Sequence, residues 1–241
     1  MPFRPLAVCA PDDRAQSLHP SVDSRGAPRL EAGDTEIVSW PVISLADCHG
    51  SIGNAKQHPD VSGRLHVTAA RVLAVAADFA QGTHHIGLGL IADPVANWSS
   101  KRSAGKSMAG RFLVGQMRMP WVSDVGYSVR KNRKTPATIR ICGSHRTDFG
   151  DQETVMLIAG LPDSVDPRQV AEDIVRRVLD DRLGWEDTTP QEEGALRQAR
   201  LPHPSDVAAG QIPVAHLVGS FVVSPRSGYL GTNSVRSRPA N

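Results

Sequence analysis

One segment limits the possible folds of this chain more than any other, because it joins an apolar run to a capped amphipathic helix. Residues 153–161 read ETVMLIAGL, a pattern that is typical of a buried strand. After a short loop, Asp166 and Pro167 occupy the positions that favour an N-cap and a first helical residue. Apolar side chains then recur at helical spacing. The sequence therefore predicts a strand at 153–161 followed by a helix at 166–183.

Two further helices are predicted in the first half of the chain. Residues 61–80 are rich in alanine and apolar on nearly every side, which favours a buried helix over a strand. Residues 98–118 are predicted as a second helix, which Pro120 closes. Between them, residues 84–92 read HHIGLGLIA, and the pattern fits either a strand or a short helix.

Strands and turns complete the prediction. Pro41 confines the strand expected at 36–45 to a sheet edge or a bulge, because proline cannot donate a ladder hydrogen bond. Residues 125–129 and 138–142 are interpreted as the arms of a hairpin around a basic turn. The remaining expectations are a loop over 47–63, a short helix over 191–200 and a last strand over 214–223.

Together these elements predict an α+β or α/β fold, with a small mixed sheet and packed helices. A chain of 241 residues can bury such a core without disulfides or a metal. Prolines spread through the first 35 residues predict a disordered, flexible N-terminal arm. The expected organisation is that arm over residues 1–35 and a basic α/β region over 36–147. A strand–helix–strand region over 148–223 and a flexible tail over 224–241 follow.

The sequence also bounds the location of the protein. No stretch approaches the roughly 18 apolar residues of a membrane helix, and the first residues do not resemble a secretory signal. The three cysteines are widely separated and form no C-x-x-C pair, which argues against a disulfide framework or a zinc site. We therefore expect a soluble cytoplasmic protein with reduced thiols, no membrane contact, no metal and no cofactor.

Charge is distributed in blocks, although the formal net charge is only +2. Residues 101–147 contain 11 basic residues and one acidic residue, whereas residues 148–207 contain 6 basic and 14 acidic residues. A basic block of this kind is typical of a surface that binds an anionic partner such as DNA or RNA. The alternative is that the basic and acidic blocks neutralise each other within the fold. The sequence leaves both interpretations open.

The leading hypothesis is a nucleic-acid-binding or regulatory protein. Residues 65–112 loosely resemble a helix-turn-helix, in which residues 99–111 would be the recognition helix and the basic hairpin a wing. Phosphate contacts are expected from basic side chains in that helix and in the hairpin turn. They are Lys101, Arg102, Lys106, Arg111, Arg130, Lys131, Arg133 and Lys134.

Two alternatives come from other classes of protein. Gly105, Lys106 and Ser107 match the end of a Walker A loop, although Ser100 replaces its first glycine. This match predicts an enzyme that binds a phosphorylated ligand at a helix N-terminus. The third hypothesis is a protein-interaction module whose basic half meets an acidic partner or its own acidic half. The sequence identifies no catalytic residue, so whether the protein is an enzyme is left open.

Overall fold

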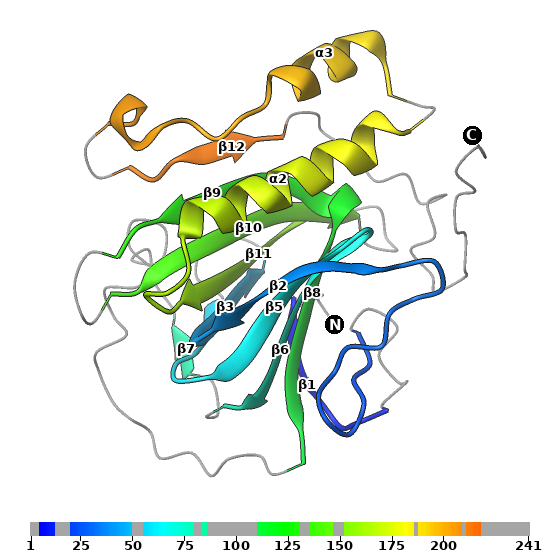
Figure 1. Ribbon diagram of the computed structural model, residues 1–241, viewed down its shortest axis with the longest axis vertical. Coiled ribbons are helices and arrows are strands. Elements are labelled where there is room, and N and C mark those ends of the chain that lie inside the picture. The colour runs from blue at the N-terminus through cyan, green and yellow to red at the C-terminus, as the bar shows by residue number, and fades with distance from the viewer. Residues whose placement is uncertain are drawn as a thin grey trace.

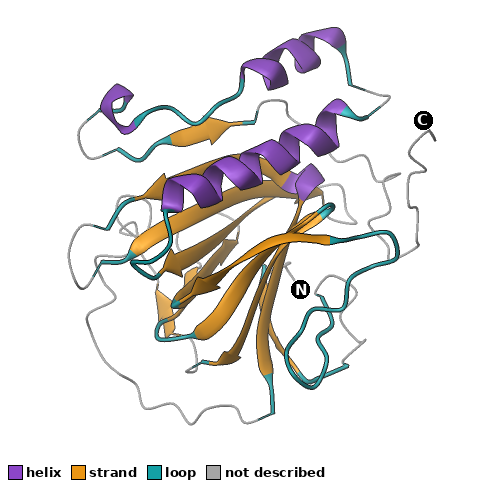
Figure 2. Cartoon of the chain, in the orientation of Figure 1, coloured by secondary structure: helices purple, strands orange, loops and turns teal. Residues whose placement is uncertain are grey.

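The computed structural model describes residues 5–12, 20–49, 55–79, 83–85, 110–130, 135–146, 152–185, 188–208 and 211–217. Within these ranges the chain is mostly β-structure, with two sheets of antiparallel strands and two α-helices (Figures 1 and 2). The predicted α+β or α/β class, a small mixed sheet packed with helices, is therefore wrong.

The first sheet has five strands in the order β1-β8-β6-β5-β2. All four pairings are antiparallel. Its edge strand β2 contains Pro41, so the position expected for this proline is confirmed. The strands are β1 (Leu6–Cys9), β2 (Glu36–Val42), β5 (Ser62–Thr68), β6 (Arg71–Asp78) and β8 (Phe112–Arg118).

The second sheet has seven strands in the order β12-β9-β10-β11-β3-β4-β7. The chain passes from β2 into this sheet through one residue, Ile43, and passes from β8 through the short helix η1 (Met119–Trp121). The strands are β3 (Ser44–His49), β4 (Ala55–His58), β7 (Thr83–His85), β9 (Val122–Ser128), β10 (Ala137–Arg146), β11 (Gln152–Leu161) and β12 (Val214–His216).

The main core lies between the two sheets and under the helix α2 (Pro167–Leu183), which contacts β9, β10 and η1. Figure 1 shows α2 lying across β9 and β10. The second helix, α3 (Pro190–Gln198), contacts α2. The core side chains are all apolar and almost fully buried, among them Val72, Leu113, Ile139, Leu157 and Ile174.

The unit formed by β11 and α2 confirms the strongest sequence prediction. Asp166 is the N-cap, and its side chain accepts a hydrogen bond from the backbone N–H of Arg168. Pro167 is the first helical residue, and Gly184 follows the last turn. The hairpin of β9 and β10 is also confirmed, with Thr138 paired to Ser128. The short helix expected at 191–200 is α3, and the strand expected from 214 begins there as β12.

The helix predicted over 61–80 is instead the antiparallel hairpin of β5 and β6. On β6, Val72 and Ala74 face the main core, whereas Val75 belongs to a smaller core on the other face of the sheet. A strand that is buried on both faces loses the apolar–polar alternation, so its sequence resembles a buried helix. That double burial explains the error.

The same cause accounts for the end of the helix predicted over 98–118. Residues 112–118 form β8, and residues 98–109 lie outside the described residues. Phe112 and Val114 on β8 pack in the smaller core with Cys9, Val22 and Val75. In addition, the loop predicted over 47–63 contains β4 and the end of β3.

The N-terminal segment differs from the disordered arm that was predicted. Its β1 is an edge strand paired with β8, and Val22 is fully buried. The prolines prevent a helix, as expected, but they do not prevent an extended path across the outer face of the five-stranded sheet. The tail predicted over 224–241 lies outside the described residues.

Candidate nucleic-acid interface

The basic turn leaves the sheet at one end of the β9–β10 hairpin. The last paired residues are Ser128 and Thr138, whose hydroxyl oxygens are 2.7 Å apart in a hydrogen bond. Beyond them, the side chain of Val129 is exposed, and Arg130 is exposed as well. Residues 131–134 connect the two strands and lie outside the described residues. The structure therefore describes where the turn begins and ends.

Arg130 forms an ion pair with Asp163, which belongs to the turn between β11 and α2. The two turns lie at the same end of the sheet, because Ala137 at the start of β10 is paired with Leu161 at the end of β11. Both charged side chains are well exposed, 37% for Arg130 and 68% for Asp163. This contact joins the basic block of the sequence to the acidic block.

The other described arginines of the basic block do not gather around Arg130. Arg111 is exposed immediately before β8, and Figure 1 shows β8 beginning at the bottom of the molecule, whereas β9 ends at the left. Arg118 at the end of β8 binds Glu31 through both terminal nitrogens, at 2.8 and 3.4 Å. Arg140 is half-buried in the middle of β10. The two described members of the predicted contact set, Arg111 and Arg130, therefore lie apart.

The remaining predicted contact residues lie outside the described residues and stay predictions. The helix-turn-helix interpretation, however, is wrong, because the beginning of its span, residues 65–78, lies in the strands β5 and β6 rather than in a helix. The predicted phosphate-binding turn also lies outside the described residues and stays a prediction. The undescribed residues of the predicted nucleic-acid contact set are Lys101, Arg102, Lys106, Lys131, Arg133 and Lys134. Those of the predicted phosphate-binding turn are Gly105, Lys106 and Ser107.

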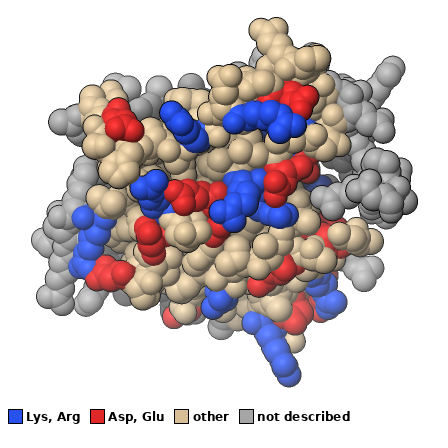
Figure 3. All heavy atoms as spheres, turned by 45° about the horizontal axis from the view of Figure 1, so that its top comes forward, with Lys and Arg blue, Asp and Glu red and all other residues tan. Residues whose placement is uncertain are grey.

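The helical face carries both signs of charge. Figure 3 shows blue and red side chains alternating over this face, with no large area of one sign. The ion pairs on α2 and α3 follow helical spacing, and they are Arg168–Glu172, Arg176–Asp173, Arg177–Asp180 and Arg197–Glu193. A balanced face of this kind does not favour binding to a polyanion.

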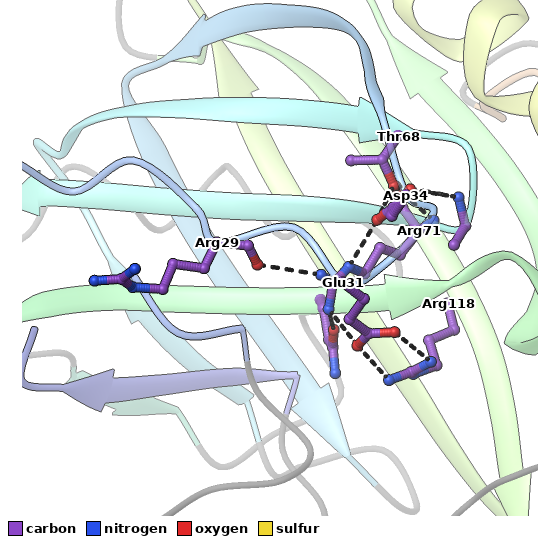
Figure 4. A network of polar contacts seen from close by, with 8 residues as sticks. Arg29, Glu31, Asp34, Thr68, Arg71 and Arg118 are labelled. Carbon is purple, nitrogen blue, oxygen red and sulfur yellow. Dashed lines mark hydrogen bonds and ion pairs between the residues drawn. The ribbon is translucent and has the colours of Figure 1, made fainter. Parts of the chain in front are cut away.

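Sequence reasoning missed a buried ionic network that centres on Arg71 (Figure 4). Only 2% of its side chain is exposed, and it donates hydrogen bonds to Glu31 at 2.8 Å, Asp34 at 3.3 Å and the Gln116 side chain at 3.1 Å. Asp34 is also 2% exposed and accepts a hydrogen bond from the hydroxyl of Thr68 at 3.0 Å. Burial lowers the pKa of Arg71.

This network fixes the N-terminal segment on the five-stranded sheet. Asp34 accepts a further hydrogen bond from the backbone N–H of Ala70, in the turn between β5 and β6. Glu31 bridges Arg71 and Arg118. No local pattern predicts these contacts of Glu31 and Asp34, since the partners are separated by 34 to 87 positions in the chain. The network is structural in character, because its carboxylates already neutralise its guanidinium groups.

A second buried arginine, Arg182, lies in the last turn of α2. Its guanidinium donates hydrogen bonds to backbone carbonyls of Leu217 at 2.5 Å, Pro120 at 3.4 Å and Val122. Burial lowers the pKa of Arg182 to about 10. The side chain thereby ties η1, β9 and the residue after β12 to the helix, which is also a structural role.

Neither the Cys142 thiol nor the pair of His216 with Asp124 has the arrangement of a nucleophilic site. Burial raises the pKa of the Cys142 thiol to about 12, so this thiol stays protonated at neutral pH. His216 pairs with Asp124 at 2.6 Å, but the Ser123 hydroxyl donates to Asp124 rather than to the imidazole. The order of these contacts therefore differs from that of a serine triad.

The described ranges contain neither a metal-binding cluster nor a membrane-spanning helix. No group of three or more His, Cys, Asp or Glu side chains there is arranged to hold a metal ion. None of the helices there has both the length and the apolar character that crossing a membrane requires. Comparison of the whole chain with protein-family models, with curated proteins and with solved structures gave no match.

Proposed function

We propose that this protein binds DNA or RNA through the basic turn between β9 and β10. The observation that carries the proposal is the position of this turn, which connects two long paired strands and begins with the exposed Arg130. Its sequence, Arg130-Lys131-Asn132-Arg133-Lys134, has four cations and no acidic residue. The proposal keeps the cytoplasmic location expected from the sequence.

The proposed mechanism is electrostatic docking on the phosphate backbone. Lys and Arg side chains that neutralise phosphates release counterions from the nucleic acid, and this release makes the affinity depend steeply on salt. Lys101, Arg102, Lys106 and Arg111 are proposed as further phosphate contacts. The helix-turn-helix that would have supplied a recognition helix is not formed, so the proposal includes no contacts that distinguish bases. We therefore expect binding that depends little on the nucleotide sequence.

The test compares two charge reversals of equal size. Binding of the purified protein to random duplex DNA and to single-stranded RNA is measured over a salt series. About six phosphate contacts give a slope of log K against log salt of about −5. Arg133→Glu with Lys134→Glu is expected to flatten this slope by about 2 and to weaken binding at every salt concentration.

The control reverses two exposed arginines on the helical face, Arg176→Glu with Arg197→Glu, and changes the net charge by the same amount. We expect the control to retain most of the affinity, because its charges lie on the balanced face. Equal losses in the two variants would show that only net charge matters. Absence of binding by the parent protein at low salt would refute the proposal.

The Arg130–Asp163 pair favours a second candidate, a protein-interaction module with complementary basic and acidic surfaces. In that case the turn would meet an acidic protein or the acidic half of another copy rather than nucleic acid. The salt series separates the two candidates. A protein that ignores nucleic acid but associates with itself at low salt, and loses that association in Arg133→Glu with Lys134→Glu, fits the second.

A further inference from the structure

The contact between Arg130 and Asp163 has an unusual position for a surface ion pair. It joins two turns at the same end of the seven-stranded sheet, and it places a carboxylate on the first cation of the proposed binding turn. Asp163 is one of two exposed residues at the start of the connection from β11 to α2, the other being Ser164. Neither residue is part of the helix or its N-cap, which is Asp166.

Such a pair contributes little to the stability of the fold, because both side chains are solvated. The buried network of Arg71 and Asp34, with both side chains 2% exposed, already provides a strong contact elsewhere. A weak pair is suited to exchange. A phosphate group offers the Arg130 guanidinium the same bidentate geometry as a carboxylate and a higher charge.

We propose that Asp163 is an intramolecular competitor for Arg130, which restrains binding of nucleic acid at the β9–β10 turn. This inference rests on the proposed function. In this exchange a phosphate that binds Arg130 displaces the carboxylate of Asp163, which takes up a cation from solution. The exchange lowers the affinity and also reduces the net number of ions released.

Two variants at the connection to α2 test the proposal in opposite directions. Asp163→Asn removes the competing charge and is expected to tighten binding to random duplex DNA about two- to five-fold at low salt. The slope of log K against log salt should become steeper by up to about 0.9. Ser164→Asp adds a carboxylate beside the pair, and we expect it to weaken binding.

The matched control is Asp180→Asn, which removes an exposed aspartate from an ion pair with Arg177 on α2. It makes the same change of net charge, and screening by salt should keep its effect within about 1.5-fold. The second control is a double-mutant cycle with Arg130→Ala. In the Arg130→Ala background, Asp163→Asn should lose most of its effect, because the residue for which it competes is gone.

The outcomes separate this inference from the proposed function. If the parent protein fails to bind nucleic acid, both are refuted. If the parent binds and Arg133→Glu with Lys134→Glu weakens it, but Asp163→Asn matches Asp180→Asn, only the competitor role of Asp163 is refuted. An effect of Asp163→Asn that persists unchanged without Arg130 would also refute it, since the charge would then act on the whole molecule.

Discussion

A guanidinium group with almost no exposure to water needs carboxylates or other acceptors within the fold, and Arg71 finds them in the N-terminal segment. The residue at the start of β6 thereby depends on residues of the segment between β1 and β2. Desolvation of both Arg71 and Asp34 means that the loss of one leaves the other charged and unpaired.

We therefore expect Arg71→Ala to lower the free energy of unfolding by about 3–5 kcal/mol, because the Asp34 carboxylate would remain buried without its cation. Urea unfolding followed by circular dichroism measures the change. Arg118→Ala serves as the control, since Arg118 is 31% exposed and should cost no more than about 1 kcal/mol. Similar losses in the two variants would contradict the role assigned to burial.

Cys142 gives a second prediction at this scale, concerning alkaline pH. Its pKa is raised by burial to about 12 in the folded chain, from a value of 9.0 for an unperturbed thiol. The neutral thiol stabilises the fold fully below pH 9, and this contribution is lost as the pH rises from 9 towards 12. Unfolding measured from pH 8 to 10.5 should show a smaller alkaline loss in Cys142→Ala than in the parent.

A related observation checks the same thiol. Cys142 should react with a thiol reagent much faster after unfolding than before it, because the folded chain keeps it protonated and partly buried. Met156 stands between Cys142 and Cys48 in the sheet register, so the two cysteines are two strands apart. Rapid reaction in the folded state would contradict the raised pKa.

At the scale of elements, the N-terminal segment is the clearest departure from expectation. It supplies β1, it contributes Val22 to the smaller core, and it carries Glu31 and Asp34 to Arg71. A flexible arm could be removed without loss, whereas this segment completes a sheet edge and a core.

Deletion of residues 1–35 is therefore expected to abolish cooperative unfolding, because it exposes apolar side chains on β8 and leaves Arg71 buried without a carboxylate. Circular dichroism during urea unfolding is the measurement. Full-length Glu31→Gln with Asp34→Asn keeps the segment and removes only its charges, so it should unfold cooperatively at a lower midpoint. An unchanged transition in the shortened chain would support the flexible arm instead.

The elements that sequence predicted are those whose signals are local. The N-cap at Asp166 and the alternating arms of the β9–β10 hairpin lie within a few residues of the structure they specify. By contrast, Val75 on the second face of β6 is covered by Val22, which is more than 50 positions away in sequence. Phe112 and Val114 on β8 are buried by the same N-terminal segment. The periodicity of apolar residues within a short window does not show that a distant segment covers the second face of a strand.

For the candidate interface, the sequence identified the basic turn and its strands but not the residue that opposes it. The two blocks of charge predicted some neutralisation, and the structure gives one described instance in Arg130 and Asp163. That partner depends on the pairing of β10 with β11, which brings the two turns to one end of the sheet. Counts of charge along the chain could not identify Asp163 as the partner, because they do not show which residues of β10 and β11 are paired.

At the scale of the whole molecule, the described charges form ion pairs in separate parts of the surface. Carboxylates from the N-terminal segment neutralise Arg71 and Arg118 on one side, and paired charges cover α2 and α3. Arg130, where the basic turn begins, lies in another part of the structure and pairs with Asp163. The described charges are therefore largely paired with near neighbours, and the salt series tests whether the cations of the basic turn bind a polyanion.

The pairing of β1 with β8 also sets an order of events during synthesis of the protein. Leu6 lies opposite Gly115, so the strand that leaves the ribosome early must wait for a partner made about a hundred residues later. At about 5–20 residues per second, this delay lasts for about 5–20 s. Throughout that time β1 has no partner strand, so its backbone donors and acceptors stay unpaired within the sheet until β8 has been made.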